Sequence, residues 1–122
     1  YIQYAHARCC SIFRQAEAAG ISGGAWAQAD LTLLAEPGEL DLVRKMAAFP
    51  DEVLSAAIER APSRIAKYGL DVASVFHSFY NECRVISDDT ALTVARLALV
   101  DAAKTVIANA LNIMGIAAPE RM

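Results

Sequence analysis

The stretch from Thr90 to Met114 constrains the fold most, because it contains neither glycine nor proline and carries a regular apolar stripe. The stripe consists of residues at seven-residue steps, namely Leu92, Leu99, Val106 and Ile113, and it is widened by Ala103, Ala110 and Leu111. Seven residues are close to two helical turns, so these side chains are expected on one face of a helix. Ser87-Asp88-Asp89 supplies N-cap chemistry before this segment, and Gly115 supplies a stop after it. The pattern predicts a long helix over residues 90–114.

The rest of the chain shows apolar residues at three- and four-residue steps, in segments separated by glycine and proline. Helices are therefore expected over residues 1–19, 37–49, 50–61 and 63–84. In the second of these, the predicted core stripe is Leu40, Val43, Met46 and Ala47. Between the first two, Ser22-Gly23-Gly24 predicts a loop, Trp26 is expected to anchor it on the core, and Asp30 is expected to cap a short helix.

The composition agrees with one all-helical domain. The 122 residues have the length of a single domain, and 56% hydrophobic against 20% charged residues exclude a disordered chain. Neither strand alternation nor an uninterrupted apolar run of about 18 residues is present, so a sheet and a membrane span are not expected. We predict an all-α helical bundle over residues 1–122. The chain starts at Tyr1 without an initiator Met, which is typical of a fragment of a larger protein.

The charge limits how the domain could bind nucleic acid. Its formal net charge is −3, whereas nucleic-acid-binding domains are commonly basic. Any RNA contact is therefore expected to be local and to depend on base stacking and base edges, and neither DNA nor a membrane is an expected partner. The three cysteines, two of them adjacent, form a poor disulfide framework and favour the reducing cytoplasm.

A candidate binding cluster lies at one edge of the first predicted helix. At about 100° per residue, Tyr1, Tyr4 and Arg8 fall together, away from the apolar stripe of that helix. Aromatic faces stack unpaired bases, and arginine adds cation–π contacts and paired hydrogen bonds. The same spacing also fits two packed tyrosines beside a surface arginine, so the pattern alone leaves both interpretations open.

A second candidate lies near the end of the helix expected over residues 63–84. Phe76, Phe79, Tyr80 and Cys83 form a core stripe, and Asn81 lies off it with an amide that could read a base edge or bond to a loop carbonyl. A metal site is not expected, because the chain has no CxxC or HxxxH pair. A cysteine nucleophile is not expected either, since no orienting third group is visible.

Four segments, in order along the whole chain, resemble the helical C-terminal anticodon-binding domain of arginyl-tRNA synthetases. They are residues 1–8 (YIQYAHAR), 76–85 (FHSFYNECRV), 96–104 (RLALVDAAK) and 114–122 (MGIAAPERM). The third is similar to the Asp-Ala-Leu-Arg signature of that fold, but Ala103 and Lys104 depart from it. Because lysine does not replace arginine at paired hydrogen bonds, no base-reading role is assigned to Lys104, and Asp101 is expected to tie helices together.

The resemblance implies the anticodon-binding fold of class I aminoacyl-tRNA synthetases and a surface that holds the anticodon stem-loop of tRNA(Arg). It implies contacts from Tyr1, Tyr4 and Arg8, from Tyr80 and Asn81, and from Met122. The catalytic domain in the same chain would ligate arginine to tRNA with ATP and magnesium. The family's ATP-handling motifs are absent from these residues, so no catalytic residue and no cofactor is expected in this fragment.

Two alternatives remain at the level of sequence. Cysteinyl-tRNA synthetase and one type of glycyl-tRNA synthetase subunit carry similar domains, although the YxxYAHxR start and PERM end favour the arginyl enzyme. A helical protein-interaction module would also fit the acidic charge and the alanine-rich helices.

Overall fold

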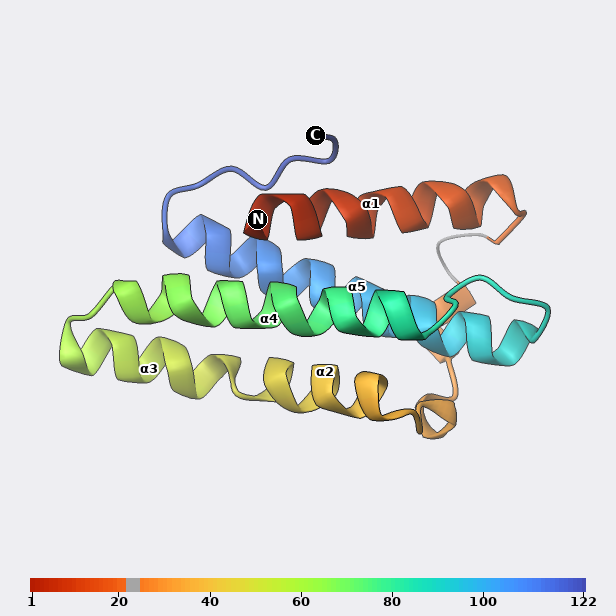
Figure 1. Ribbon diagram of the computed structural model, residues 1–122, viewed down its shortest axis with the longest axis horizontal. Coiled ribbons are helices and arrows are strands. Elements are labelled where there is room, and N and C mark those ends of the chain that lie inside the picture. Colours follow the sequence, from red (N-terminus) through yellow and green to blue (C-terminus); the bar gives the residue numbers. More distant parts are fainter. Residues whose placement is uncertain (22–24) are drawn as a thin grey trace.

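The computed structural model describes residues 1–21 and 25–122, and within them every regular element is a helix (Figure 1). The α-helices are α1 (Ile2–Ala18), α2 (Pro37–Ala47), α3 (Phe49–Glu59), α4 (Ser63–Glu82) and α5 (Thr90–Ile113). Two short 3-10 helices, η1 (Ala25–Gln28) and η2 (Leu31–Leu33), lie between α1 and α2. The predicted all-α bundle is confirmed. In these described ranges, no helix is both long and apolar enough to cross a membrane.

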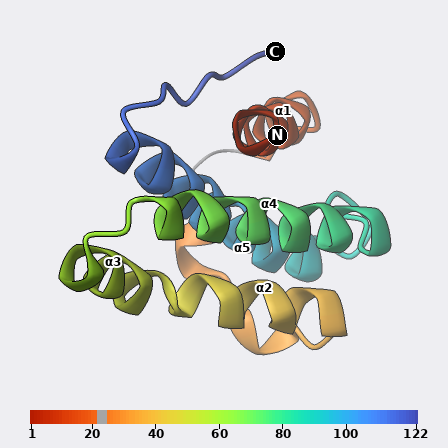
Figure 2. The ribbon, with the colours of Figure 1, turned by 60° about the vertical axis from the view of Figure 1, so that its left-hand side comes forward.

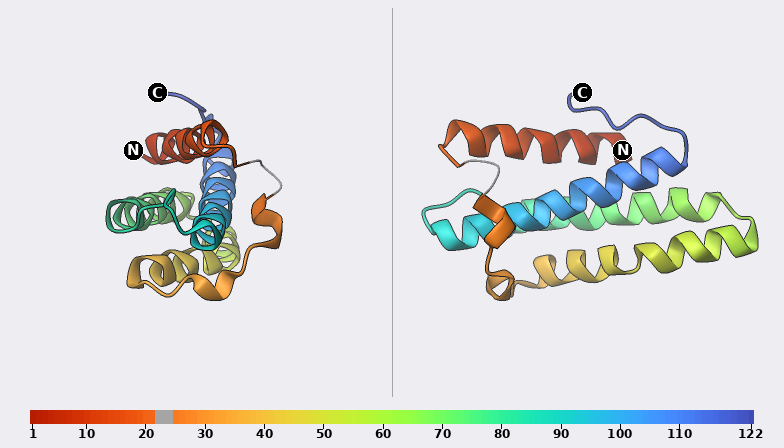
Figure 3. Two further views of the ribbon diagram at one scale, coloured as in Figure 1. Left: turned by 90° about the vertical axis from the view of Figure 1, so that its right-hand side faces the viewer. Right: turned by 180° about the vertical axis from the view of Figure 1, so that it is seen from behind.

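The helices form three layers, with α4 and α5 in the middle (Figure 2). Helix α1 covers one side of this pair, while α2 and α3 cover the other. Helix α5 crosses α4 obliquely, in front of it in the view from behind (Figure 3, right), and contacts α1, α2 and α4. After α5 the chain turns back and runs along α1, which brings residues 117–122 beside the first helix.

The boundaries of the helices follow the local chemistry of the sequence. The Asp30 side chain accepts a hydrogen bond from the Thr32 backbone at 3.1 Å, and Asp89 accepts one from Leu92 at 3.2 Å. Both caps were predicted and are confirmed. Pro50 lies in the first turn of α3, where a missing N–H costs nothing. Trp26 packs on the core, 4.9 Å between its ring centre and that of Phe13, as expected; the predicted loop at residues 22–24 lies outside the described residues.

The predicted stripe of α2 is largely wrong, because Met46 is the one member of it that packs against the core. Leu40 and Val43 are 37% and 41% exposed, whereas Gly38, Glu39 and Leu42 are the buried residues of this helix. The buried face contains a carboxylate and a glycine, so it lacks the apolar periodicity by which a buried face is predicted. The neighbouring face is more apolar and was predicted as the core face instead. Gly38 allows close packing, because a Cβ there would lie 2.9 Å from Glu82 Oε2 and 3.5 Å from the Phe79 Cα.

The stripe predicted for α5 is right only in part. Of the predicted residues, Leu99, Ala103, Ala110 and Leu111 are buried, but Ile113 is 52% exposed, and Leu92 and Val106 are half-buried. The residues at the centre of the packing are Ala95, Leu97, Val100, Ala103 and Ile107, all of which have no exposed surface. A helix that passes between two layers buries more than one face, and small alanines let its neighbours approach closely. A single stripe therefore describes α5 poorly.

Candidate functional site

Arg8 and the two tyrosines Tyr4 and Tyr80 meet where α1 packs against α4. The Arg8 guanidinium carbon lies 5.1 Å from the centre of the Tyr4 ring and 4.6 Å from that of Tyr80. Its Nη2 donates a hydrogen bond to the Tyr4 hydroxyl at 2.5 Å. No carboxylate of the described residues pairs with Arg8. Two aromatic rings thus hold a half-buried guanidinium whose charge is available to an anionic or polar ligand.

His77 of α4 supports the exposed tyrosines. Its ring centre is 5.4 Å from that of Tyr1 and 5.7 Å from that of Tyr4. Burial, and next the charge of Arg8, lower the pKa of His77, so the imidazole is neutral at pH 7. Its Nε2 is a buried polar atom without a hydrogen-bond partner among the described residues. The His77 ring therefore acts as an aromatic support, and Tyr1 belongs to the same surface through it.

Side chains of α1 fix the tail that follows α5. Gln3 Nε2 donates to the Ala117 carbonyl at 2.9 Å, and Arg14 Nη1 donates to the Glu120 carbonyl at 3.2 Å. His6 is 5% exposed, and its Nδ1 lies 2.8 Å from the Pro119 carbonyl. Because a carbonyl only accepts, Nδ1 carries the proton. These three bonds hold the tail in one path along α1.

The tail closes a pocket of about 520 Å³, which we call the Tyr4 pocket. It contains four of the six predicted site residues, namely Tyr4, Arg8, Tyr80 and Met122. The sequence reasoning missed its other members, which are Ala7, Ser11, Arg14, Gln15 and Arg121. The signal for Gln15 and Ser11 was their spacing of seven and three residues from Arg8 along one helical edge.

A second pocket of about 620 Å³, the Asn81 pocket, adjoins the first. Tyr80 and Gln15 line both pockets. Asn81 lies in this second pocket and not in the first, so the structure separates it from Met122. The remaining lining residues are Ile12, Glu82, Cys83, Arg84, Val85 and Ile86.

The charge around the two pockets is opposite to that of the whole chain. Their lining includes Arg8, Arg14, Arg84 and Arg121 but only one acidic residue, Glu82. The chain as a whole has 14 acidic and 11 basic residues, so its acids gather elsewhere. A locally positive, aromatic surface on an acidic domain favours an anionic ligand with flat groups.

A buried ion pair, missed by the sequence reasoning, fixes the loop after α4. Arg96 Nε donates to Glu39 Oε2 at 2.9 Å, and Arg96 Nη1 donates to the Arg84 carbonyl at 2.8 Å. Glu39 has no exposed surface, so its carboxylate is buried together with its partner. Asp101, expected to tie helices together, is instead exposed, and within the described residues its side chain makes no interhelical bond. The pair between α2 and α5 provides that tie.

The cysteines form no reactive centre in the described part of the chain. All three are buried and unpaired. Burial raises the pKa of the Cys9 thiol to about 12, so it stays protonated and is a poor nucleophile. Cys10 Sγ lies 3.9 Å from His6 Nδ1, but that nitrogen donates its proton to the Pro119 carbonyl. These side chains pack the core and the tail.

Comparison with known proteins gives one consistent match. The DALR anticodon binding domain family model matches residues 2–122. The chain is 52% identical over its whole length to an arginine–tRNA ligase of Symbiobacterium thermophilum, and it spans 22% of that protein. It is also 52% identical to the arginine–tRNA ligase of Heliobacterium modesticaldum, again spanning 22% of it. The chain thus corresponds to about a fifth of these relatives.

Solved structures agree with this match. The arginyl-tRNA synthetase of Thermus thermophilus superposes with a TM-score of 0.85 at 37% identity, over the whole chain and 21% of that protein. A putative arginyl-tRNA synthetase of Campylobacter jejuni gives a TM-score of 0.88 at 31% identity, over the whole chain and 26% of that protein. Sequence and fold together show that the chain belongs to the DALR anticodon-binding domain family of arginyl-tRNA synthetases.

Proposed function

We propose that this domain holds the anticodon stem-loop of tRNA(Arg) and inserts an unstacked loop base into the Tyr4 pocket. The observation that carries this function is the guanidinium of Arg8, held between the rings of Tyr4 and Tyr80 in a pocket that Met122 also lines. A base can stack on a tyrosine ring while Arg8 bonds to its edge or to phosphate. Tyr1 extends the aromatic surface, and Asn81 contributes an amide beside it.

The complete protein is proposed to be an arginine–tRNA ligase, which joins arginine to tRNA with ATP and magnesium. We assign that chemistry to a part of the protein beyond the 22% of the relative's length that this chain spans, and the catalytic domain is then a partner in the same polypeptide. An apolar depression between α3 and α5 offers a contact for it, since Val53, Met114 and the 52% exposed Ile113 line it. The three free cysteines favour the cytoplasm as its compartment.

Replacing Tyr4 by Ala in the complete enzyme tests this function. Loss of one stacked base costs about 1–3 kcal/mol, so kcat/KM for tRNA(Arg) is expected to fall about 10-fold or more. The KM values for arginine and ATP are expected to stay within about 2-fold, because Tyr4 does not belong to that chemistry. Tyr4→Phe keeps the ring, loses only the hydroxyl bonded to Arg8 and should fall less than Tyr4→Ala. Wild-type kinetics for Tyr4→Ala would exclude the Tyr4 pocket as the anticodon site.

Deleting residues 120–122 tests the part assigned to the tail. The deletion removes Met122, whose thioether side chain is 74% exposed at the rim of the Tyr4 pocket and free to cover a base. The expected result is an increase of about 10-fold in the KM for tRNA(Arg), since burial of one such side chain is worth about 1.5 kcal/mol. His6→Ala should give a smaller increase, because it frees the Pro119 carbonyl but leaves Met122 in the chain. An unchanged KM after the deletion would remove Met122 from the site.

A further inference from the structure

His77 lies beneath the exposed tyrosines but lines neither pocket. Tyr1 is 62% exposed and Tyr4 44%, so each ring meets solvent as well as the imidazole. Phe76 contacts the imidazole too, with 5.6 Å between the ring centres, and Phe76 itself is fully buried. Any effect of His77 on a bound base must therefore pass through Tyr1 and Tyr4.

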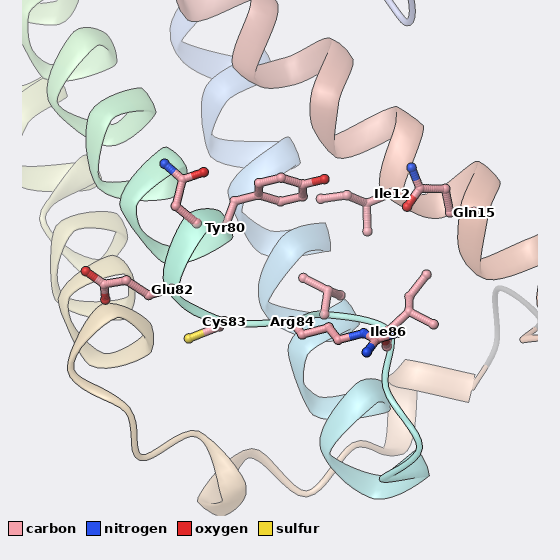
Figure 4. Close-up of a pocket in the computed structure, with 9 residues that line it drawn as sticks. Ile12, Gln15, Tyr80, Glu82, Cys83, Arg84 and Ile86 are labelled. Atoms are coloured by element: carbon pink, nitrogen blue, oxygen red, sulfur yellow. The ribbon is translucent and has the colours of Figure 1, made fainter.

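Helices α1 and α4 approach each other closely on both sides of His77. Two turns before it, a Cβ on Gly69 would lie 2.9 Å from Ile2 Cδ1 of α1. One turn after it, Tyr80 points from α4 toward Ile12 of α1 (Figure 4). The imidazole thus lies in a packed seam between two helices, and a shift of its ring would displace the tyrosines above it.

The imidazole fits this seam best in its neutral form. Its Nε2 is buried and has no hydrogen-bond partner among the described residues. A neutral imidazole can carry its proton on Nδ1, which leaves only a lone pair at Nε2. The charged form carries a proton on both nitrogens, and the N–H at Nε2 would then be buried without an acceptor.

The charges around His77 oppose its protonation as well. Helix α1 faces it with the guanidinium of Arg8 and with the phenols of Tyr1 and Tyr4. From α2, α3, α5 and the tail, no acidic group of the described residues acts on the imidazole. Burial first, and then the charges of Arg8 and of the Tyr1 amino group, lower the pKa of His77 below its ordinary value. The imidazole therefore takes up a proton only when the pH falls below about 6.5.

We propose that His77 is a positioning residue, which holds Tyr1 and Tyr4 ready for the anticodon loop only while its imidazole is neutral. Protonation places a second positive charge near Arg8 and an N–H without an acceptor at Nε2, so the ring leaves the seam and the tyrosines lose their support. Because the pKa is lowered, the support is complete at neutral pH and is lost as the pH falls through that pKa. The inference rests on the proposed function and adds a dependence on pH to it.

The dependence of tRNA binding on pH tests this role. The Kd of the complete enzyme for tRNA(Arg) is measured from about pH 8 to about pH 5, with circular dichroism at each pH to follow the fold. For the wild type, the Kd is expected to rise about 10-fold at the acidic end, as loss of one stacked base would cause. His77→Phe keeps an aromatic ring but takes up no proton, so this rise should be absent. His6→Gln removes the other histidine of the chain but can still donate to the Pro119 carbonyl, and it should keep the rise.

The possible outcomes separate this inference from the proposed function. If Tyr4→Ala weakens binding at neutral pH but His77→Phe keeps the wild-type rise of the Kd in acid, the proposed function stands and the role of His77 is overturned. Equal weakening by His77→Phe and His77→Ala at every pH would mean that His77 only fills space, which also overturns it. Tighter wild-type binding in acid would mean that a charged imidazole attracts RNA, with the same consequence. If Tyr4→Ala binds like the wild type at neutral pH, the proposed function itself fails.

Discussion

Replacing Arg8 by Ala in the complete enzyme is expected to lower kcat/KM for aminoacylation of tRNA(Arg) about 100-fold. The change removes charged hydrogen bonds to the ligand, each worth about 1.5–3 kcal/mol, and also the group that both Tyr4 and Tyr80 contact. We expect the change to appear in kcat/KM for tRNA(Arg), while the KM values for arginine and ATP stay nearly unchanged. Steady-state kinetics with each substrate varied in turn provides the measurement.

Arg8→Lys serves as the matched variant for this prediction. Lysine keeps the positive charge, but its ammonium lacks the planar surface that lies over two tyrosine rings and cannot make a paired hydrogen bond. Arg8→Lys is therefore expected to recover only a small part of the 100-fold loss estimated from the charged bonds. Full recovery by lysine would mean that Arg8 acts by charge alone, and the stacked geometry would then have no role in binding.

The local structure of this chain could be predicted well from its sequence, because capping and chain-breaking residues act over a few positions. Asp30, Pro50 and Asp89 lie at or beside the helix starts they predicted. The cluster of Tyr4 and Arg8 could be found too, since both lie on one helix and its pitch fixes their spacing. Tyr80 joined them only through the resemblance, because nothing local relates α4 to α1.

The parts that could not be predicted depend on contacts between distant elements. Glu39 and Arg96 are 57 residues apart, and each looks like a surface residue until the other is placed beside it. Glu39 is also the reason why the buried face of α2 was not predicted. The prediction relied on apolar residues at helical spacing, and a buried carboxylate interrupts that pattern. The path of the tail depends on hydrogen bonds donated by Gln3, His6 and Arg14. These bonds could not be predicted, because their acceptors are backbone carbonyls, which every residue has.

Replacing Glu39 by Ala is expected to have the largest effect on stability, about 3–5 kcal/mol of the free energy of unfolding. The Arg96 side chain is only 10% exposed, so the change leaves a buried guanidinium without its carboxylate. It also removes the 3.0 Å hydrogen bond that the Glu36 backbone N–H donates to Glu39 Oε1, and this bond caps the start of α2. In a domain of this size the melting temperature should fall by roughly 10 °C or more, as measured by circular dichroism on the 122-residue chain.

Asp41→Ala is the matched control, because Asp41 lies on the same helix and pairs with Arg44 at 3.3 Å in solvent, with side chains 63% and 73% exposed. Exposed pairs contribute at most about 1 kcal/mol, so this variant should melt nearly as the wild type does.

The double variant Glu39→Met with Arg96→Met replaces the buried pair by apolar groups and should recover much of the stability lost in Glu39→Ala. It would still lack the bond from Arg96 to the Arg84 carbonyl, so the loop of the Asn81 pocket should remain loose and tRNA binding weakened. Equal melting temperatures for Glu39→Ala and Asp41→Ala would show that the Glu39–Arg96 pair does not hold α2 and α5 together. A double variant that is stable but binds tRNA weakly would show that the ion pair positions the loop of the Asn81 pocket in addition to stabilising the fold.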